Sequence, residues 1–341
     1  MSLSLYVDGP MWRAHQDQLC AELPGLVPVV KGNGYGFGAA VLGEQAQRLR
    51  ADFVAVGLSR ELAAVRATYT GDLLVMQPHL PGTDPQPEPD DRVLRTVATA
   101  EGLLALDGHR VVVELGSSMH RFGLDEQGLA GCAGAVHAAR LEGFALHLPL
   151  AEPPSGRVAE VLAAAETIRR AGAPLHRLWL SHVAGAELAE LARRLPDVEL
   201  RLRVGTRLWL GANASTARAT VLAVHTLRRG ERYGYRQRRA PRAGHLLVVA
   251  GGTAHGIALS APAAGGAGQR ARSVALGGLE AVGRSLSPFR VGGARRWFAE
   301  PPHMQVSMLW LPSVEPVPAV GSELDVNVRM TTVTFDRVVI E

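Results

Sequence analysis

A regular alternation between two kinds of segment constrains the fold of this chain most strongly. Between Leu26 and about Gly211, short β-branched and apolar runs alternate with stretches rich in Ala, Leu and Arg. The runs typical of strands are Val27–Val30, Phe53–Val56, Leu73–Met76, Val111–Leu115, Gly143–His147, Leu178–Ser181 and Glu199–Val204. Intervening stretches such as Glu44–Arg50, Ser59–Ala67 and Arg157–Ala171 place apolar residues at helical spacing.

Strands that alternate with helices form parallel sheets, and about eight such units predict a TIM-like (β/α)8 barrel of the α/β class. An open, doubly wound sheet is the structural alternative. Pro78–Asp91 is expected to be a loop, and residues 265–268 a flexible connection. After Gly211 the sequence is richer in turns, with candidate strands at Leu246–Val249, Gln305–Leu311 and Leu324–Val333. We therefore expect a barrel domain over residues 1–214 and a C-terminal, mostly β domain over residues 215–341.

The composition argues against several classes of protein. Hydrophobic residues make up 47% of the chain and charged residues 20%, which favours a large folded core over disorder. No apolar run is long enough to predict a membrane span, and the N-terminus does not resemble a secretory signal. The two cysteines, Cys20 and Cys132, suit a reducing compartment and form neither a disulfide framework nor a metal-ligand set. We therefore expect a cytoplasmic protein without a metal site.

The basic residues raise the question of nucleic-acid binding, since the net charge is +4. The densest basic cluster runs from Arg228 to Arg242 and includes Tyr233 and Tyr235. No helix-turn-helix, zinc-finger or RNA-recognition pattern accompanies this cluster. A solvated loop or a subunit interface explains it better than a nucleic-acid partner does.

The use of lysine points to amine chemistry at one position. The chain has 36 basic residues, and among them only Lys31 is a lysine. It follows an expected strand and precedes a glycine-rich turn. Arginine can replace lysine as a surface cation, but its guanidinium cannot form an imine. A desolvated lysine amine has a lowered pKa and forms Schiff bases with carbonyls, including pyridoxal phosphate. The simpler alternative is a leftover surface lysine.

The barrel prediction brings distant polar residues together. Active sites of (β/α)8 barrels lie at the carboxyl ends of the strands. Lys31, Arg121, His147 and Arg203 each lie at or just beyond the end of an expected barrel strand, so we expect them to converge on one mouth. Taken singly, the two arginines could be ordinary ion-pair residues and the histidine a hydrogen-bonded core residue.

Longer motifs occur in order along nearly the whole chain. They are Val29–Gly38 beside V-K-A-N-A-Y-G-H-G, Ser118–Gly123 beside G-M-x-R-L-G, Phe144–His147 beside a histidine-bearing strand, Arg203–Gly211 beside R-P-G-I-x-L-Y-G, Gly230–Arg236 beside G-E-x-V-S-Y-G, and Gln305–Leu309 beside R-V-S-M-D. Together they resemble the motifs of the alanine racemase family, pyridoxal-phosphate enzymes of fold type III. Their conserved order makes the resemblance more specific than any single motif.

The resemblance implies a barrel, a β domain, a head-to-tail homodimer, and pyridoxal phosphate carried by Lys31. It implies that Tyr35, Gly205 and Thr206 bind the cofactor phosphate, that Arg203 faces the pyridine nitrogen beside His147, that Arg121 orients the cofactor and the substrate carboxylate, and that Met308 contacts the substrate. Tyr235 would complete the partner's site from the β domain, as the second acid/base opposite Lys31. On the residues alone, Tyr235 could instead be a packed aromatic, and Tyr233 is a rival for its role.

Several departures from the family motifs indicate a divergent member. Ala186 and Phe335 replace hydroxyl residues that hold the phosphate, Phe37 replaces a histidine, Leu309 an aspartate, and Arg236 a glycine. Glu114 occupies the position at which some members carry a carbamylated lysine that supports the motif arginine, here Arg121. Weaker phosphate binding and a changed substrate pocket are expected from these replacements.

The leading functional hypothesis is a pyridoxal-phosphate amino-acid racemase that interconverts L- and D-alanine with Lys31 and Tyr235 as its two bases. A second hypothesis keeps the fold and cofactor but acts on another amino acid, by racemisation, decarboxylation or retro-aldol cleavage. A third is a cofactor-binding homologue with little catalysis, because a fold alone does not fix function.

Overall fold

The computed structural model describes residues 2–153, 155–183, 185–259 and 285–341. The expected flexible connection at residues 265–268 lies outside them. The chain divides into two compact units, of which one comprises Arg13–Gly34 and Gly38–Ala212. The other comprises the described parts of Met1–Trp12, Tyr35–Phe37 and Asn213–Glu341. The expected boundary at residue 214 lies close to this division, whereas the N-terminal residues group with the C-terminal unit.

The first unit contains a closed parallel barrel in the strand order β2-β3-β4-β5-β6-β7-β8-β9. Its strands are β2 (Leu26–Val30), β3 (Phe53–Val56), β4 (Asp72–Val75), β5 (Val93–Val97), β6 (Arg110–Leu115), β7 (Arg140–Leu146), β8 (Arg177–Ser181) and β9 (Glu199–Val204). The closed barrel confirms the (β/α)8 prediction over the open sheet. Alternate strand residues, among them Val29, Phe53 and Trp179, form its inner core, and the last two rings meet edge to face with centroids 5.0 Å apart.

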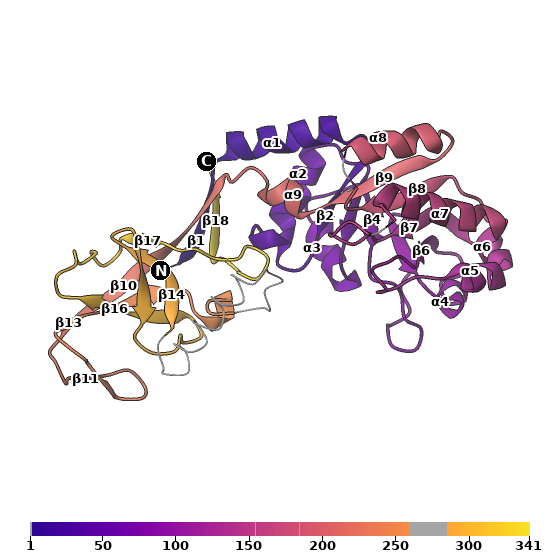
Figure 1. Cartoon of the computed structure of the whole chain (residues 1–341). Coiled ribbons are helices and arrows are strands. Elements are labelled where there is room, and N and C mark those ends of the chain that lie inside the picture. Colours follow the sequence, from indigo (N-terminus) through magenta and orange to yellow (C-terminus); the bar gives the residue numbers. More distant parts are fainter. Residues whose placement is uncertain (1, 154, 184, 260–284) are drawn as a thin grey trace. The chain divides into compact units, whose positions relative to one another are not determined.

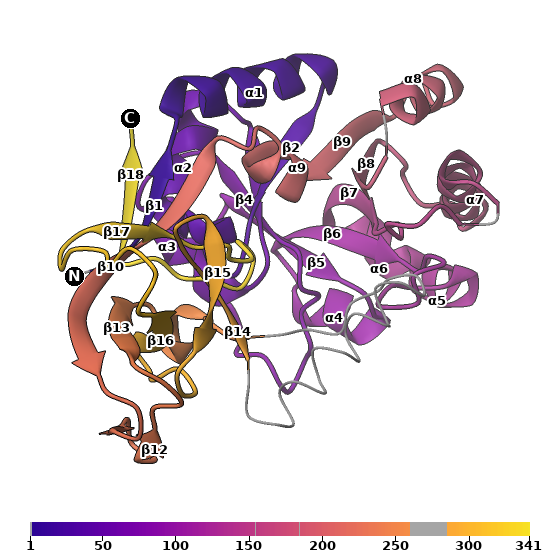
Figure 2. The ribbon, with the colours of Figure 1, turned by 60° about the vertical axis from the view of Figure 1, so that its left-hand side comes forward.

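Helices connect the barrel strands, as Figure 2 shows for α4 to α8 around β5 to β9. They are α1 (Gly9–Glu22), α2 (Ala39–Arg48), α3 (Leu62–Arg66), α4 (Ala100–Ala105), α5 (Glu126–Gly131), α6 (Ala133–Ala138), α7 (Arg157–Arg170), α8 (Gly185–Arg194) and α9 (Thr206–Leu210), with short 3-10 helices η1 (Gly34–Gly36) and η2 (Ser59–Glu61). The connection from β4 to β5 is the expected loop and contains no helix. The sequence pattern missed β5 because Arg95 and Thr96 interrupt its apolar run, although both side chains are buried.

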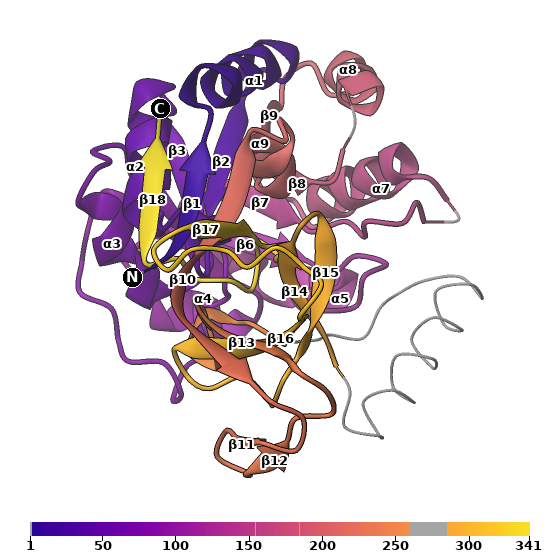
Figure 3. The same cartoon turned by 90° about the vertical axis from the view of Figure 1, so that its left-hand side faces the viewer.

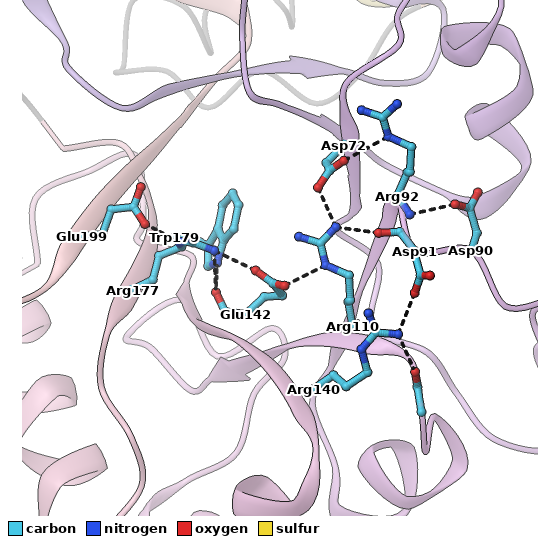
Figure 4. A network of polar contacts seen from close by, with 11 residues as sticks. Asp72, Asp90, Asp91, Arg92, Arg110, Arg140, Glu142, Arg177, Trp179 and Glu199 are labelled. Carbon is cyan, nitrogen blue, oxygen red and sulfur yellow. Dashed lines mark hydrogen bonds and ion pairs between the residues drawn. The ribbon is translucent and has the colours of Figure 1, made fainter.

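Charged residues connect neighbouring strands around the amino end of the barrel (Figure 4). Arg110 donates to Asp72 at 2.5 Å and to Glu142 at 2.7 Å, and Arg177 donates to Glu142 at 2.8 Å and to Glu199 at 2.5 Å. The guanidinium of Arg177 also lies 5.7 Å from the ring centroid of Trp179. These pairs occupy the amino end, so the polar residues predicted to be functional lie at the opposite end of the strands.

The C-terminal unit is built on one mostly antiparallel sheet in the described residues, with the order β14-β15-β16-β13-β10-β1-β18 and β17 paired to β10. Its strands are β1 (Leu3–Val7), β10 (Ser215–Leu227), β13 (Gly244–Ala250), β14 (Leu286–Val291), β15 (Ala294–Phe298), β16 (Val306–Pro312), β17 (Glu323–Asp325) and β18 (Arg337–Ile340), and a 3-10 helix, η3 (Thr253–His255), follows β13. Leu5 of β1 pairs with Ala217 on one side and with Val338 on the other, as the neighbouring strands in Figure 3 show. The N-terminal strand therefore belongs to this sheet and not to the barrel.

The candidate strands at Leu246–Val249 and Gln305–Leu311 are confirmed as β13 and β16. The candidate at Leu324–Val333 is wrong beyond Asp325. Val333 is buried in the core of the sheet, but its backbone N–H donates to the Arg329 carbonyl in a turn. An apolar residue that packs from a turn was thus mistaken for part of a strand.

The basic cluster lies on a short hairpin formed by β11 (Arg232–Tyr233) and β12 (Arg238–Arg239), which extends from the sheet in Figure 1. No helix in the described part of the chain has the length and apolar character needed to cross a membrane. Within the same residues, no group of three or more His, Cys, Asp or Glu side chains could hold a metal ion.

Candidate active site

Lys31 lies directly after β2, at the carboxyl end of the first barrel strand. The preceding residues Val29 and Val30 are buried, which fixes the strand up to the lysine. Gly32 and Gly34 then adopt φ angles of 60°, a left-handed conformation that favours glycine. The chain can therefore turn sharply and leave the Lys31 side chain at the barrel mouth.

Glu61 holds the turn after Lys31, a role that the motifs did not indicate. Its carboxylate accepts hydrogen bonds from the backbone N–H groups of Gly32 at 2.8 Å, Gly57 at 2.8 Å and Leu58 at 3.1 Å. A Cβ atom on Gly57 would lie only 3.1 Å from Cβ of Lys31, so glycine permits this close approach. A lone Glu in the first turn after β3 is a weak sequence signal, because many exposed helices begin with an acidic residue.

The surroundings of Lys31 favour its neutral amine. Partial burial lowers the pKa of Lys31 first, and the charges of Arg121 and Arg203 lower it further. The nearby Glu61 carboxylate opposes them and raises the pKa. A neutral lysine amine is both a nucleophile toward carbonyls and a base.

Arg203 is buried near the end of β9, with 6% of its surface exposed. Its Nη2 donates to the carbonyls of Leu146 and Trp179, each at 3.2 Å, while its Nε has no hydrogen-bond partner in the described residues. An unpaired buried donor costs free energy unless a ligand satisfies it. The arrangement can therefore accept a hydrogen-bonding ligand beside Arg203.

Glu114 is the buried carboxylate nearest in charge to these arginines. It is 2% exposed on β6, and burial raises its pKa while Arg203 and then Arg121 lower it. It therefore interacts electrostatically with Arg203 more strongly than with Arg121, whereas the sequence suggested support for Arg121 alone.

His147 follows β7, and its ring meets that of His182 at 81° with centroids 5.5 Å apart. Burial first, then the charges of Arg203 and Arg121 with smaller effects of His182 and Lys31, lowers the pKa of His147 to about 3. The same kinds of cause lower the pKa of His182. Both imidazoles are therefore neutral around pH 7, and the sequence did not assign a role to the second.

Arg121 is exposed in the loop that follows β6. Glu160 of α7 anchors this loop by accepting from the backbone N–H of Ser118 at 2.5 Å and from its hydroxyl at 2.9 Å. Ser117 adds a 2.6 Å hydrogen bond to the carbonyl of His147. The loop thus carries the Arg121 charge to the side of the barrel where it acts on Lys31, His147 and Glu114.

Gly205 and Thr206 follow Arg203 at the start of α9. The first N–H groups of a helix have no partner within the helix, so they are suited to meet an anion. The barrel therefore brings Lys31, Arg121, His147 and Arg203 into one electrostatic cluster, with Gly205 and Thr206 directly after its last member.

The remaining predicted residues lie in the C-terminal unit. Tyr35 is buried in η1 at a φ of 53°, and Met308 lies on β16. Tyr235 is 84% exposed in the turn between β11 and β12. Tyr233, its rival, donates its hydroxyl to the Ala299 carbonyl at 3.2 Å. Of the two tyrosines, Tyr235 presents the more accessible phenol.

Fold and site together define a class: a parallel β/α barrel and a β-sheet unit, with a lysine directly after the first barrel strand. A model of the alanine racemase N-terminal domain matches residues 12–210, and the chain belongs to this family. Members of the family typically bind pyridoxal phosphate. A comparison with curated protein sequences finds no match.

Solved alanine racemases share the fold at low sequence identity. The enzyme of Bartonella henselae, with covalently bound pyridoxal phosphate, is 13% identical with a TM-score of 0.71, over 100% of both chains. The enzyme of Bacillus anthracis, with bound L-Ala-P, is 18% identical with a TM-score of 0.71, over 99% of this chain and 87% of that one. The enzyme of D-cycloserine-producing Streptomyces lavendulae is 18% identical with a TM-score of 0.66, over 100% and 97%.

Proposed function

We propose that this protein is a pyridoxal-phosphate-dependent amino-acid racemase, with alanine as the simplest substrate. One observation carries the proposal: the only lysine of the sequence directly follows the first barrel strand, and its surroundings lower its pKa. A surface cation needs neither this position nor a depressed pKa. The resemblance to alanine racemases supports the same assignment.

The residues present fit the cofactor. Lys31 supplies the amine that would hold it, and the unsatisfied Nε of buried Arg203 supplies a donor for its pyridine nitrogen. Gly205 and Thr206, with Tyr35, would hold its phosphate. Pyridoxal phosphate, when bound, supplies an electron-withdrawing ring that makes the α-proton of an amino acid acidic. Because arginine stays protonated, Arg203 would not give a proton to the ring, which limits its electron withdrawal and disfavours side reactions.

The chain's own residues would orient the substrate and move its proton. Arg121 would bind the substrate carboxylate, and Met308 would line the substrate pocket. Neutral Lys31 would take or give a proton on one face of the α-carbon, and Tyr235 of a second subunit would act on the other face. His147, neutral near pH 7, would accept or donate a hydrogen bond near the cofactor without adding a positive charge. Racemisation needs two such groups, which requires a homodimer if Tyr235 serves the partner's barrel.

A second function, cofactor binding with little catalysis, is favoured by one observation. Ala186 at the start of α8 and Phe335 lack the hydroxyls that hold the phosphate in the family motifs. Reactions at the same site that use one base, such as decarboxylation or retro-aldol cleavage, would not need Tyr235.

Exchange of the α-proton separates these possibilities. Incubation of L-alanine with the cofactor-loaded protein in deuterated water should give deuterated alanine of both configurations. Tyr235→Phe should exchange the α-proton but form the opposite enantiomer at least about 100-fold more slowly, since one face lacks its acid/base group. Tyr233→Phe is the matched control and should retain racemisation. No exchange by wild-type protein across a panel of amino acids would contradict a racemase and leave the binding function.

A further inference from the structure

The loop between β4 and β5 covers a polar cavity on the barrel. In the described residues, every other connection between successive barrel strands contains a helix, but this one does not. A cavity of about 490 Å³ lies at this place, a size typical of small-molecule sites. We call it the Arg95 cavity, and its polar lining includes Ser59, Gln77, His79, Asp84 and Arg95.

The Arg95 cavity is separate from the Lys31 site. Leu94 packs in the inner core of the barrel, and successive strand residues point to opposite faces, so Arg95 points outward. Neither Lys31, Arg121 nor Arg203 lines the cavity. A ligand held here would therefore occupy a second site.

Arg95 is a buried cation with little compensation. Only 8% of its surface is exposed. Its Nη1 donates to the Ser59 hydroxyl at a long 3.4 Å, and its Nε has no hydrogen-bond partner among the described residues. No described carboxylate lies within ion-pair distance of its guanidinium. Burying a guanidinium without an anion is costly, so the native fold retains a strong demand for a negative partner.

The neighbouring charges limit what that partner can be. Burial first, and then the charges of Arg95 and His79, lower the pKa of His109, which indicates positive potential around Arg95. Asp84 also lines the cavity, and its Oδ2 accepts from the backbone N–H of Leu80 at 2.8 Å. A single negative charge would satisfy Arg95, whereas a second one would meet repulsion from the Asp84 carboxylate.

We propose that the Arg95 cavity binds a small monocarboxylate, with the Arg95 guanidinium as its anchor. A planar guanidinium matches the two oxygens of a carboxylate, and the Ser59 hydroxyl and the Gln77 amide add neutral donors. The closed shape of the site excludes a macromolecule, and the polar lining disfavours a purely apolar ligand.

Calorimetric titration of the full chain with acetate tests the proposal, with inorganic phosphate as the second probe. Two variants isolate the site: Arg121→Met removes the carboxylate partner proposed beside Lys31, and Arg169→Met changes an exposed arginine of α7 as the matched control. Acetate should bind to wild type and to both of these. Arg95→Met should weaken acetate binding about ten-fold or more, because a charge-assisted pair is lost. Phosphate should bind more weakly than acetate.

Ser59→Leu guards against loss of folding, because it fills the cavity and leaves the Arg95 charge in place. It should also weaken acetate binding, while both variants keep the wild-type circular dichroism spectrum. Acetate binding that is absent from wild type, or unchanged in both variants, overturns the proposal. Phosphate that binds more tightly than acetate, and only with Arg95 present, overturns the assignment to a monocarboxylate.

Discussion

The carboxylate of Glu61 accepts a 2.8 Å hydrogen bond from the backbone N–H of Gly32, the residue that follows Lys31. Two further N–H groups at the end of β3 bind the same carboxylate, so one side chain ties together the ends of two barrel strands. Its charge also raises the pKa of Lys31 against the effects of burial and the arginines. Glu61 is thus both a clamp on the turn and an influence on the amine.

Removal of the Glu61 charge should make Lys31 more readily deprotonated. In Glu61→Gln the pKa of Lys31 should fall below its wild-type value by up to about one unit, since the carboxylate no longer stabilises the ammonium. The pH dependence of acylation at Lys31 measures this, because no other lysine competes in the peptide analysis. Glu44→Gln, an exposed change on α2, is the control. An unchanged or higher pKa in Glu61→Gln would contradict the charge relationship.

His147 should make the protein less stable in acid. Its folded-state pKa of about 3 lies below the ordinary 6.5, so only the unfolded state binds this proton between these values. The free energy of unfolding should therefore fall as the pH drops from 6.5 toward 3. His147→Gln should lose this part of the decline, on the order of a few kcal/mol in total, in urea unfolding at several pH values. An unchanged slope, equal to that of the exposed control His176→Gln, would count against a buried neutral imidazole.

The charge network at the amino end of the barrel should contribute to stability unequally (Figure 4). The Arg110 side chain is 14% exposed and bonds Asp72 and Glu142, whereas Arg140 is 51% exposed and pairs with Asp91. Arg110→Met should cost about 2–4 kcal/mol of unfolding free energy, because two partly buried carboxylates lose their partner. Arg140→Met should cost less than about 1 kcal/mol. Equal costs in urea unfolding would show that burial does not govern the network.

The sequence predicted the barrel because its strands are mostly continuous apolar runs, as in β3, where all four residues are buried. It missed β5, since Arg95 is a charged residue that only the three-dimensional structure shows to be buried. It also assigned β1 to the barrel, because strand pairing across more than two hundred residues leaves no local signal. Motifs could indicate Lys31 and Arg203, but the backbone hydrogen bonds of Glu61 depend on where two strands end.

Cofactor retention should depend on the missing hydroxyl at Phe335. Its ring packs beside Gly36, since a Cβ atom there would lie 3.2 Å from Cε2 of Phe335. Phe335→Tyr should tighten binding of pyridoxal phosphate about 10- to 100-fold, as a charge-assisted hydrogen bond to phosphate contributes about 1.5–3 kcal/mol. Equilibrium dialysis measures this, with Phe122→Tyr on an exposed loop as the control. Equal retention in Phe335→Tyr and wild type would mean that other groups already anchor the phosphate.

Borohydride reduction of the protein with pyridoxal phosphate, followed by peptide mass spectrometry, tests most directly whether Lys31 holds the cofactor. A pyridoxyl group should appear on Lys31 of wild-type protein at close to one per chain. Lys31→Arg, which keeps the positive charge, should carry none while retaining the wild-type circular dichroism spectrum. A label at the N-terminal amine instead of Lys31, or no label on folded wild-type protein, would contradict the assignment.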